Sequence, residues 1–144
     1  MPPELAPTVV IDTNIALDLL VFKDPATPDL LAALQTGQVR WIATAAMRDE
    51  LERVLGYPKL AARIAFHQCD TPTVLAAMDA LCQRVDPAPK APVTCPDADD
   101  QKFIDLACAH RAPLLSKDCH ITHMRKRLAA LGVCTSVTWN GLVA

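Results

Sequence analysis

The sequence predicts an α/β fold in which a mainly parallel sheet of four or five strands is covered by helices on both faces. Short apolar runs rich in β-branched residues alternate with longer segments whose apolar residues recur at helical spacing. This alternation is typical of parallel strands joined by helices. The length of 144 residues is sufficient for one hydrophobic core. We therefore expect a single domain over residues 1–144.

The N-terminal half is predicted to contain two strands, each followed by helices. The run VVI belongs to a strand over residues 8–12, and the segment that starts at Ile15 has a helical period, with Leu19 and Phe22 on the same face. Pro28 and Gly37 mark the two ends of the next helix. The other elements of this half are a strand over residues 39–45 and helices over residues 44–57, 58–68 and 71–85.

The C-terminal half is predicted to begin with a loop over residues 86–100, which holds four of the twelve prolines. This loop is not a domain linker, because the preceding segments alone would give too small a core. The elements that follow are a helix over residues 100–111, a strand over 113–116, a basic helix over 124–132 and a strand over 133–138.

Composition and charge exclude several classes of protein. The net charge of −2 argues against binding nucleic acid by bulk charge alone, and the apolar stretches are too short for a membrane span. The N-terminal sequence MPPELAPTVV lacks the layout of a secretory signal, so a cytoplasmic location is expected. Six cysteines without a Cys-x-x-Cys pair indicate reduced thiols.

Two local clusters near the C-terminus have an ordinary explanation beside a functional one. Residues 125–127 are consecutively basic and are expected to form the solvated face of a helix, with a nucleic-acid contact as the alternative. His120 and His123, with Cys119 beside them, have a spacing that could hold a metal ion, although such pairs are more often surface residues.

Acidic residues gather where the predicted strands end. Asp12 closes the first strand, and Asp118 follows the strand that contains PLLS. Ligands of such sheets bind outside the carboxyl ends of the strands, so both carboxylates are expected at the ligand-binding edge. The same edge should receive acids from two predicted helix starts, namely Glu50, Asp97, Asp99 and Asp100.

Each acid also has a structural explanation. Asp97 fits the N-cap of the helix that follows, with Asp100 in the place of a capping-box acid. Glu50 could form an ion pair with Arg48 or Arg53 on a helix surface. Asp12 and Asp118 could cap turns.

Taken together, the acids point to a bound cation. Carboxylates at one edge repel one another and raise each other's pKa unless a cation lies among them. Mg²⁺ and Mn²⁺ accept such oxygen ligands and support phosphate chemistry. Asn14 and Ser116, next to these acids, could hold a water or a substrate phosphate, or simply cap turns.

Four segments in this order resemble the PIN domain nucleases: VVIDTNIALDLL, MRDELERVL, CPDADDQKFIDLACAH and LLSKDCHIT. The segment GVCTSVTWNGLV is similar to the last strand and terminal segment of the bacterial branch whose members are toxins of toxin–antitoxin pairs. The resemblance covers nearly the whole chain. It implies a three-layer α/β/α sandwich and a metal-dependent endoribonuclease.

The resemblance also implies which residues act. Asp12, Glu50, Asp100 and Asp118 correspond to the family's metal-binding and catalytic acids, with Mg²⁺ or Mn²⁺ as the cofactor. Asp100 is preferred to Asp97 because it lies seven residues before Ala107, the family's spacing, and Asp97 is an extra acid. His120 stands where many members carry a further Asp. Lys117 or Ser116 could contact the RNA backbone.

Other interpretations remain open at this point. A PIN-like module impaired at His120 could bind RNA or a protein without cleaving either. A phosphatase of the haloacid dehalogenase class also ends its first strand on Asp, but Asn14 replaces its usual second Asp. The expected partners are an RNA substrate and an antitoxin protein, no membrane is expected, and homo-oligomer formation stays undecided.

Overall fold

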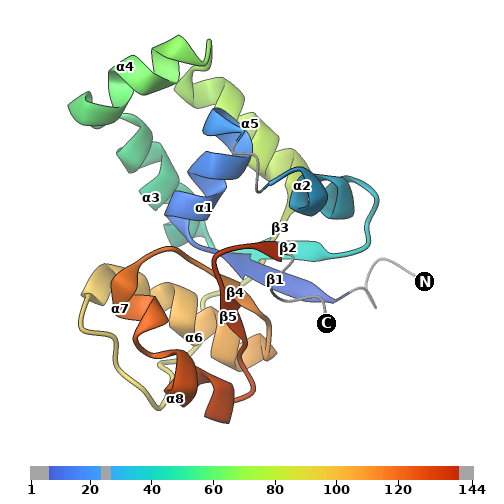
Figure 1. Cartoon of the computed structure of the whole chain (residues 1–144), viewed down its shortest axis with the longest axis vertical. Helices are drawn as coiled ribbons and strands as arrows, with labels where there is room; N and C mark the ends of the chain where they lie inside the picture. The colour runs from blue at the N-terminus through green and yellow to red at the C-terminus, as the bar shows by residue number, and fades with distance from the viewer. Residues whose placement is uncertain (1–6, 24–26, 140–144) are drawn as a thin grey trace.

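The computed structural model describes residues 7–23 and 27–139, and a five-stranded sheet runs through its centre (Figure 1). The strands are β1 (Thr8–Ile11), β2 (Arg40–Ala43), β3 (Cys82–Arg84), β4 (Leu114–Leu115) and β5 (Thr135–Ser136). Their order across the sheet is β3-β2-β1-β4-β5, and every neighbouring pair is parallel. The predicted α/β class with a parallel sheet is confirmed.

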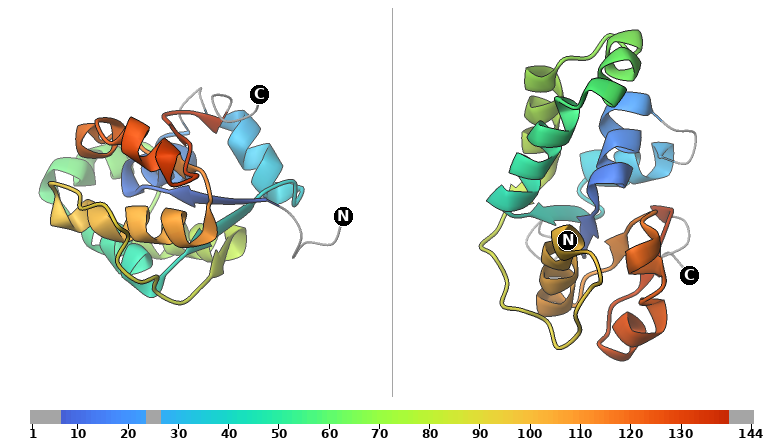
Figure 2. Two further views of the ribbon diagram at one scale, coloured as in Figure 1. Left: turned by 90° about the horizontal axis from the view of Figure 1, so that it is seen from below. Right: turned by 90° about the vertical axis from the view of Figure 1, so that its left-hand side faces the viewer.

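Helices lie on both sides of these strands. The first group comprises α1 (Thr13–Leu17), the π-helical turn η2 (Asp18–Phe22), α2 (Pro28–Gln35), α3 (Ala45–Leu55), α4 (Pro58–Phe66) and α5 (Thr71–Leu81). The second group comprises the 3₁₀ turn η3 (Ala98–Asp100), α6 (Gln101–His110), α7 (Cys119–Thr122) and α8 (Arg125–Ala130). In Figure 1 and the right view of Figure 2, the helices from α1 to α5 are above the strands and those from α6 to α8 are below them.

The central position of β1 explains its apolar sequence. Val9 and Val10 are completely buried and Ile11 nearly so, as expected for a parallel strand covered on both faces. Leu114 and Leu115 of β4 pair with Val10 and Ile11 and are also fully buried. The carboxyl ends of β1 and β4 therefore lie side by side on a rigid core.

Helix α6 packs against β1 and β4 and fixes the start of the second helical group. Phe103, Ile104, Leu106 and Ala107 are each at most 1% exposed, and they recur at helical spacing on the face that meets the sheet. Burial of this face holds Asp100, the residue before α6, in one place.

The structure differs most from the sequence prediction at β3, β5 and α7, and several other elements are a few residues shorter than predicted. The helix predicted over residues 71–85 ends at Leu81, and Cys82–Arg84 instead form edge strand β3. Their backbone pairs with β2, although Gln83 and Arg84 are exposed and lack an apolar strand pattern. The last strand is shorter than predicted, and the short helix α7 was not predicted.

Two further expectations can be compared with the described residues. All six cysteines are free thiols, as expected. Within residues 7–23 and 27–139, no helix combines the length and the apolar character that crossing a membrane requires.

Candidate active site

The four predicted metal-binding acids come from four separate segments. Asp12 follows β1 and caps α1, and Asp118 follows β4 and caps α7. Glu50 lies in α3, and Asp100 lies at the junction of η3 and α6. Asp12 interacts electrostatically with the other three, so the fold brings the predicted set together at the carboxyl ends of β1 and β4.

Asp12 is a buried carboxylate with two hydrogen bonds. It is 4% exposed; its Oδ1 accepts from the Thr13 amide at 2.7 Å and its Oδ2 from the Ser116 hydroxyl at 2.6 Å. Burial raises the pKa of Asp12 to about 6; the two hydrogen bonds oppose the rise, and the charges of Glu50 and Asp118 add to it. Asp12 thus caps a helix and also belongs to a repelling acidic cluster.

Ser116 connects the two strand ends. Its hydroxyl donates to Asp12 and accepts from the Asp118 amide at 3.0 Å. Ser116 is only 2% exposed, which disfavours a contact with an RNA backbone, and that contact stays a prediction. Its side chain positions acids.

Asp100 carries the least satisfied carboxylate of the site. It is 6% exposed, and its Oδ2 is a buried atom that has no hydrogen-bond partner in the described part of the chain. Burial raises the pKa of Asp100, and the hydrogen bond with Asp118 and the charges of Asp12, Asp118 and Asp97 raise it further. The site therefore favours a proton, or another cation, at this position.

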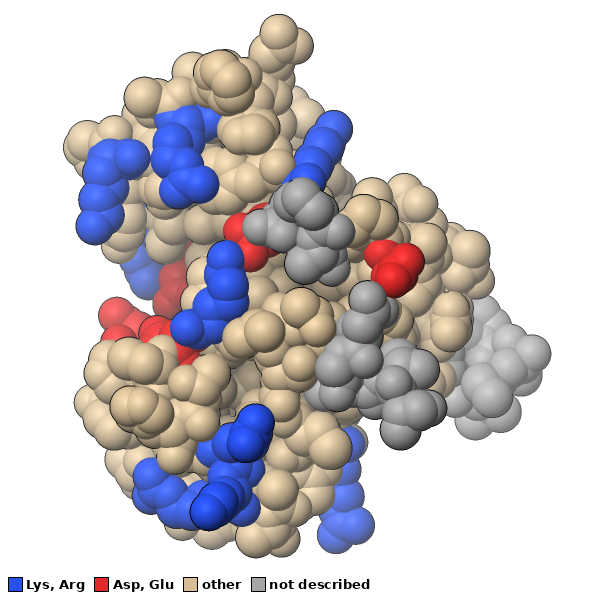
Figure 3. Space-filling view, in the orientation of Figure 1, with Lys and Arg blue, Asp and Glu red and all other residues tan. Residues whose placement is uncertain are grey.

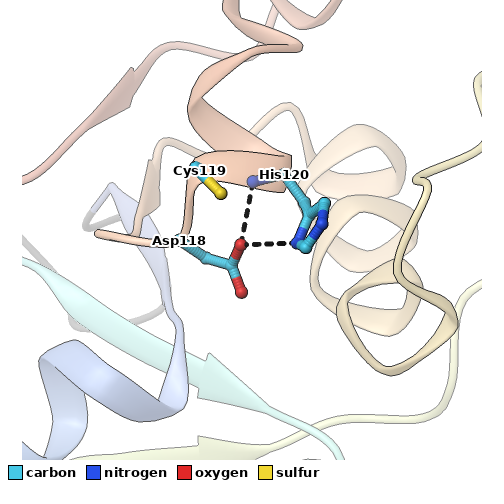
Figure 4. Close-up of side chains that lie close together, drawn as sticks. All are labelled: Asp118, Cys119 and His120. Carbon is cyan, nitrogen blue, oxygen red and sulfur yellow. Dashed lines mark hydrogen bonds and ion pairs between the residues drawn. The ribbon is translucent and has the colours of Figure 1, made fainter.

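Asp118 is the ionised partner of Asp100. Burial would raise the pKa of Asp118, but hydrogen bonds from Asp100 and from the amide and ring of His120 bring it below its ordinary value. The His120 amide donates to Asp118 Oδ1 at 2.8 Å, and Nδ1 of the ring lies 3.0 Å from the same oxygen (Figure 4). His120 therefore belongs to the site.

Asp97 also reaches this group. It caps the 3₁₀ turn, as its Oδ1 accepts from the Asp99 amide at 2.9 Å. Asp97 is therefore an N-cap, as expected, but it caps the turn η3 and not the helix α6. One oxygen of Asp97 lies 3.9 Å from Nδ1 of His120. One ligand atom from each of Asp97, Asp100, Asp118 and His120 lies within 4.8 Å of the others.

Glu50 already has partners. Its Oε1 accepts from Lys102 Nζ at 2.7 Å, and its Oε2 accepts from the Thr13 hydroxyl. The predicted alternative, an ion pair with Arg48 or Arg53, is wrong. Glu50 points inward and is 9% exposed.

Arg48 lies on a different side of α3 and binds Asp79. Two of its guanidinium nitrogens donate to the two oxygens of Asp79 at 2.8 and 2.9 Å. This ion pair lowers the pKa of the Asp79 carboxyl.

Lys102 is a site residue that the sequence interpretation missed. Besides Glu50, its Nζ donates to the Asp99 carbonyl at 2.6 Å. A lysine in the first turn of a helix is unfavourable for the helix dipole unless it has an anionic partner. This unfavourably placed lysine, two residues after Asp100, was the signal available in the sequence.

Lys117 and Asn14 lie at the margin of the acidic cluster. Lys117 Nζ forms an ion pair of 2.5 Å with Asp18 Oδ2. The Lys117 amide is 3.4 Å from Asn14 Oδ1, so Asn14 helps to hold the loop after β4 against α1. The side chain of Lys117 is 46% exposed and remains accessible to a ligand.

The surface combines these acids with basic neighbours. Figure 3 shows acidic side chains in an indentation between the two groups of helices, with Lys and Arg side chains above and below it. Residues 125–127 are exposed on α8, as predicted for a solvated helix face. A polyanion at the indentation would therefore meet local positive charge despite the net charge of −2.

The donor set is suitable for a hard divalent cation. Carboxylate oxygens are the ligands that Mg²⁺ and Mn²⁺ prefer. Burial, with a smaller effect of neighbouring acids, raises the pKa of Asp12 and Asp100. The Asp100 Oδ2 supplies an oxygen that forms no hydrogen bond within residues 7–23 and 27–139. The residues present therefore fit such an ion.

Comparisons with known proteins agree with this fold. Residues 8–119 match the sequence profile of a family described as PIN domain. No curated protein matches the chain. A solved structure with a similar fold is described as the crystal structure of VapBC2 from Rickettsia felis bound to a DNA fragment from their promoter.

The structural likeness is extensive, although the sequences have diverged. The TM-score is 0.61 at 12% sequence identity, over 90% of this chain and 97% of that chain. At this identity the likeness shows the fold, whereas the profile match spans most of the sequence. The chain belongs to the PIN domain family.

Proposed function

We propose that this PIN domain is a ribonuclease that hydrolyses phosphodiester bonds with a water activated by Mg²⁺ or Mn²⁺. The main support is that acids from four segments lie together at one indentation. Burial and mutual repulsion raise the pKa of Asp12 and Asp100 there. A stable fold keeps such a cluster most readily if a cation binds it.

Asp12, Glu50, Asp100 and Asp118 would hold the metal. When bound, a divalent ion lowers the pKa of a coordinated water and neutralises charge that develops on the phosphate. No nucleophilic side chain is required for this chemistry.

The chain's own residues orient these ligands. Ser116 and the Thr13 amide fix both oxygens of Asp12, and the Thr13 hydroxyl fixes one oxygen of Glu50. Asp100 and Asp118 share a hydrogen bond, so together they hold a proton when no metal is bound. Lys117 is exposed beside the acids and is our candidate for a contact with the phosphate backbone.

The biological role we propose is that of the toxin in a toxin–antitoxin pair. The fold is similar to that of a chain in the VapBC2 toxin–antitoxin complex, and the motifs resemble the toxin branch of the family. A nuclease acting on cellular RNA needs restraint, so we expect an antitoxin protein as the partner. Free thiols at all six cysteines are compatible with a reducing cytoplasm.

A cleavage assay tests this function. Purified protein is incubated with mixed RNAs and with DNA, with Mn²⁺ or Mg²⁺ and with a chelator. We expect RNA cleavage that requires the metal and disappears in Asp12→Asn. Asp29→Asn, the same change on the exposed surface of α2, is the matched control.

A second candidate is a binding module without catalytic activity, and the Glu50–Lys102 ion pair favours it. Lys102 occupies one oxygen of Glu50, and Thr13 occupies the other. RNA binding in a gel-shift experiment without cleavage in any metal would replace the ribonuclease with this candidate.

A further inference from the structure

One part of the acidic cluster contains a nitrogen ligand. Asp97, Asp100, Asp118 and His120 come from η3, its flanks and the start of α7, and their ligand atoms lie within 4.8 Å of one another. This set shares Asp100 and Asp118 with the proposed catalytic acids but adds an imidazole. Its chemistry therefore differs from that of an all-carboxylate site.

A separate observation concerns the Asp100 carboxylate of this set. Asp100 is 94% buried, yet its Oδ2 has no hydrogen-bond partner among the described residues. A buried carboxylate oxygen without a donor costs free energy of about 1–3 kcal/mol or more. A cation among the four residues would remove that cost.

The nearby lysine does not neutralise this set. Lys102 Nζ is bound to Glu50 Oε1 and to the Asp99 carbonyl oxygen. The described residues thus place three carboxylates around His120, and a neutral imidazole adds no positive charge.

His120 is arranged to become a ligand. Its Nδ1 lies 3.0 Å from Asp118 and 3.9 Å from Asp97, so it faces the same space as both carboxylates. The side chain is 45% exposed, which leaves the ring room to adjust. An ion at Nδ1 replaces the hydrogen bond from this nitrogen to Asp118, because only the neutral tautomer with its proton on Nε2 presents a lone pair at Nδ1.

We infer that Asp97, Asp100, Asp118 and His120 form a mixed nitrogen and oxygen site that selects first-row transition ions over Mg²⁺, and Mn²⁺ is the transition ion used to test it. Imidazole ligands favour transition metals, whereas Mg²⁺ prefers oxygen ligands and water. The inference rests on the proposed function, because the two share Asp100 and Asp118, and it names the class of metal that this site takes.

Cys119 offers an alternative set. Its Sγ lies within 4.8 Å of ligand atoms of Asp118 and His120, and Figure 4 shows the three side chains together. We favour the set with Asp100 because the unpartnered oxygen belongs to it. Cys119→Ser therefore separates the two sets.

The test measures both affinity and the identity of the ligand. Isothermal titration gives the Kd of Mn²⁺ and of Mg²⁺ for wild type, His120→Asp and His120→Ala, without RNA. Electron spin-echo spectroscopy of the Mn²⁺-loaded protein detects a directly bound ¹⁴N nucleus. His123→Ala and Cys119→Ser are controls, since both residues are exposed in the same segment.

We expect wild type to show the ¹⁴N signal and both His120 variants to lose it. His120→Ala should weaken Mn²⁺ binding at least tenfold and Mg²⁺ binding less than threefold. His120→Asp should lower the preference for Mn²⁺ over Mg²⁺ at least tenfold. The two controls should match wild type.

Loss of the signal in Cys119→Ser, or an unchanged metal preference in both His120 variants, would overturn the inference. These results are independent of cleavage. Metal-dependent RNA cleavage without a ¹⁴N signal would leave the proposed function intact and reject only the nitrogen ligand. A ¹⁴N signal without RNA cleavage would support the nitrogen ligand and reject the proposed ribonuclease.

Discussion

The Ser116 hydroxyl donates a hydrogen bond of 2.6 Å to Asp12 Oδ2, although the two residues are 104 positions apart. Both atoms are buried, and this bond opposes the rise in the pKa of Asp12. Ser116, which follows β4, thus lowers the pKa of Asp12, which follows β1.

Ser116→Ala should therefore weaken both the fold and the metal site. Loss of a charge-assisted hydrogen bond to a buried group costs about 1–3 kcal/mol of unfolding free energy, and the pKa of Asp12 should rise. Urea unfolding and Mn²⁺ titration measure the two effects. Ser136→Ala, in neighbouring β5, is the control; equal effects in both variants would contradict a specific role of Ser116.

Asp12→Asn should separate activity from stability. Removing the central carboxylate should reduce RNA cleavage at least a hundredfold, because the metal loses a charged ligand. The variant should be as stable as wild type or more stable near neutral pH, since a buried charge disappears from a repelling cluster. Thermal melts check this expectation; an unfolded variant would show that Asp12 serves mainly as the α1 cap.

The metal-free protein should lose stability as pH rises. The folded-state pKa of Asp12 is raised from 3.8 to about 6. The protonated carboxyl therefore contributes to the stability of the folded state in full below pH 3.8, and this contribution is lost as pH rises through about 6. At about 1.4 kcal/mol per pKa unit, this loss amounts to about 3 kcal/mol. The pKa of Asp100 is shifted in the same direction.

Urea unfolding in chelator at about pH 5 and about pH 7.5 measures about half of this loss, because the rest occurs between pH 3.8 and about pH 5. Asp12→Asn should reduce the difference between the two pH values, whereas Asp29→Asn should not. Mn²⁺ at millimolar concentration should restore stability at the higher pH, because an ion that binds only the folded state stabilises it by mass action. Equal stability of the metal-free wild type at both pH values would contradict the electrostatic description of the site.

Lys102→Met should make the stability of the protein depend more strongly on added metal. The substitution leaves Glu50 Oε1 without its partner, although the Thr13 hydroxyl still binds Oε2. We expect a loss of about 1–3 kcal/mol without metal, recovered in Mn²⁺, and tighter Mn²⁺ binding. Lys59→Met on exposed α4 is the control, and unchanged Mn²⁺ affinity in Lys102→Met would exclude competition between the lysine and the ion.

The sequence allowed Asp12 and Asp118 to be placed because each follows an apolar strand, and the carboxyl ends of parallel strands meet at one edge. The role of Lys102 could not be predicted in the same way, since it depends on a contact between α3 and α6, which are 52 residues apart at Glu50 and Lys102. Strand β3 was missed because its side chains are mostly exposed, and backbone pairing with β2 stabilises it.

The arrangement of β1 between β2 and β4 has a consequence for synthesis of the protein. A chain that is still being translated can form β1 and the first group of helices early, but β4, Ser116 and Asp118 emerge more than 100 residues after Asp12. Until then Asp12 lacks its serine donor, and the cluster lacks its fourth acid. A fragment truncated before β4 would lack Ser116 and Asp118, so under the proposed function it should not cleave RNA.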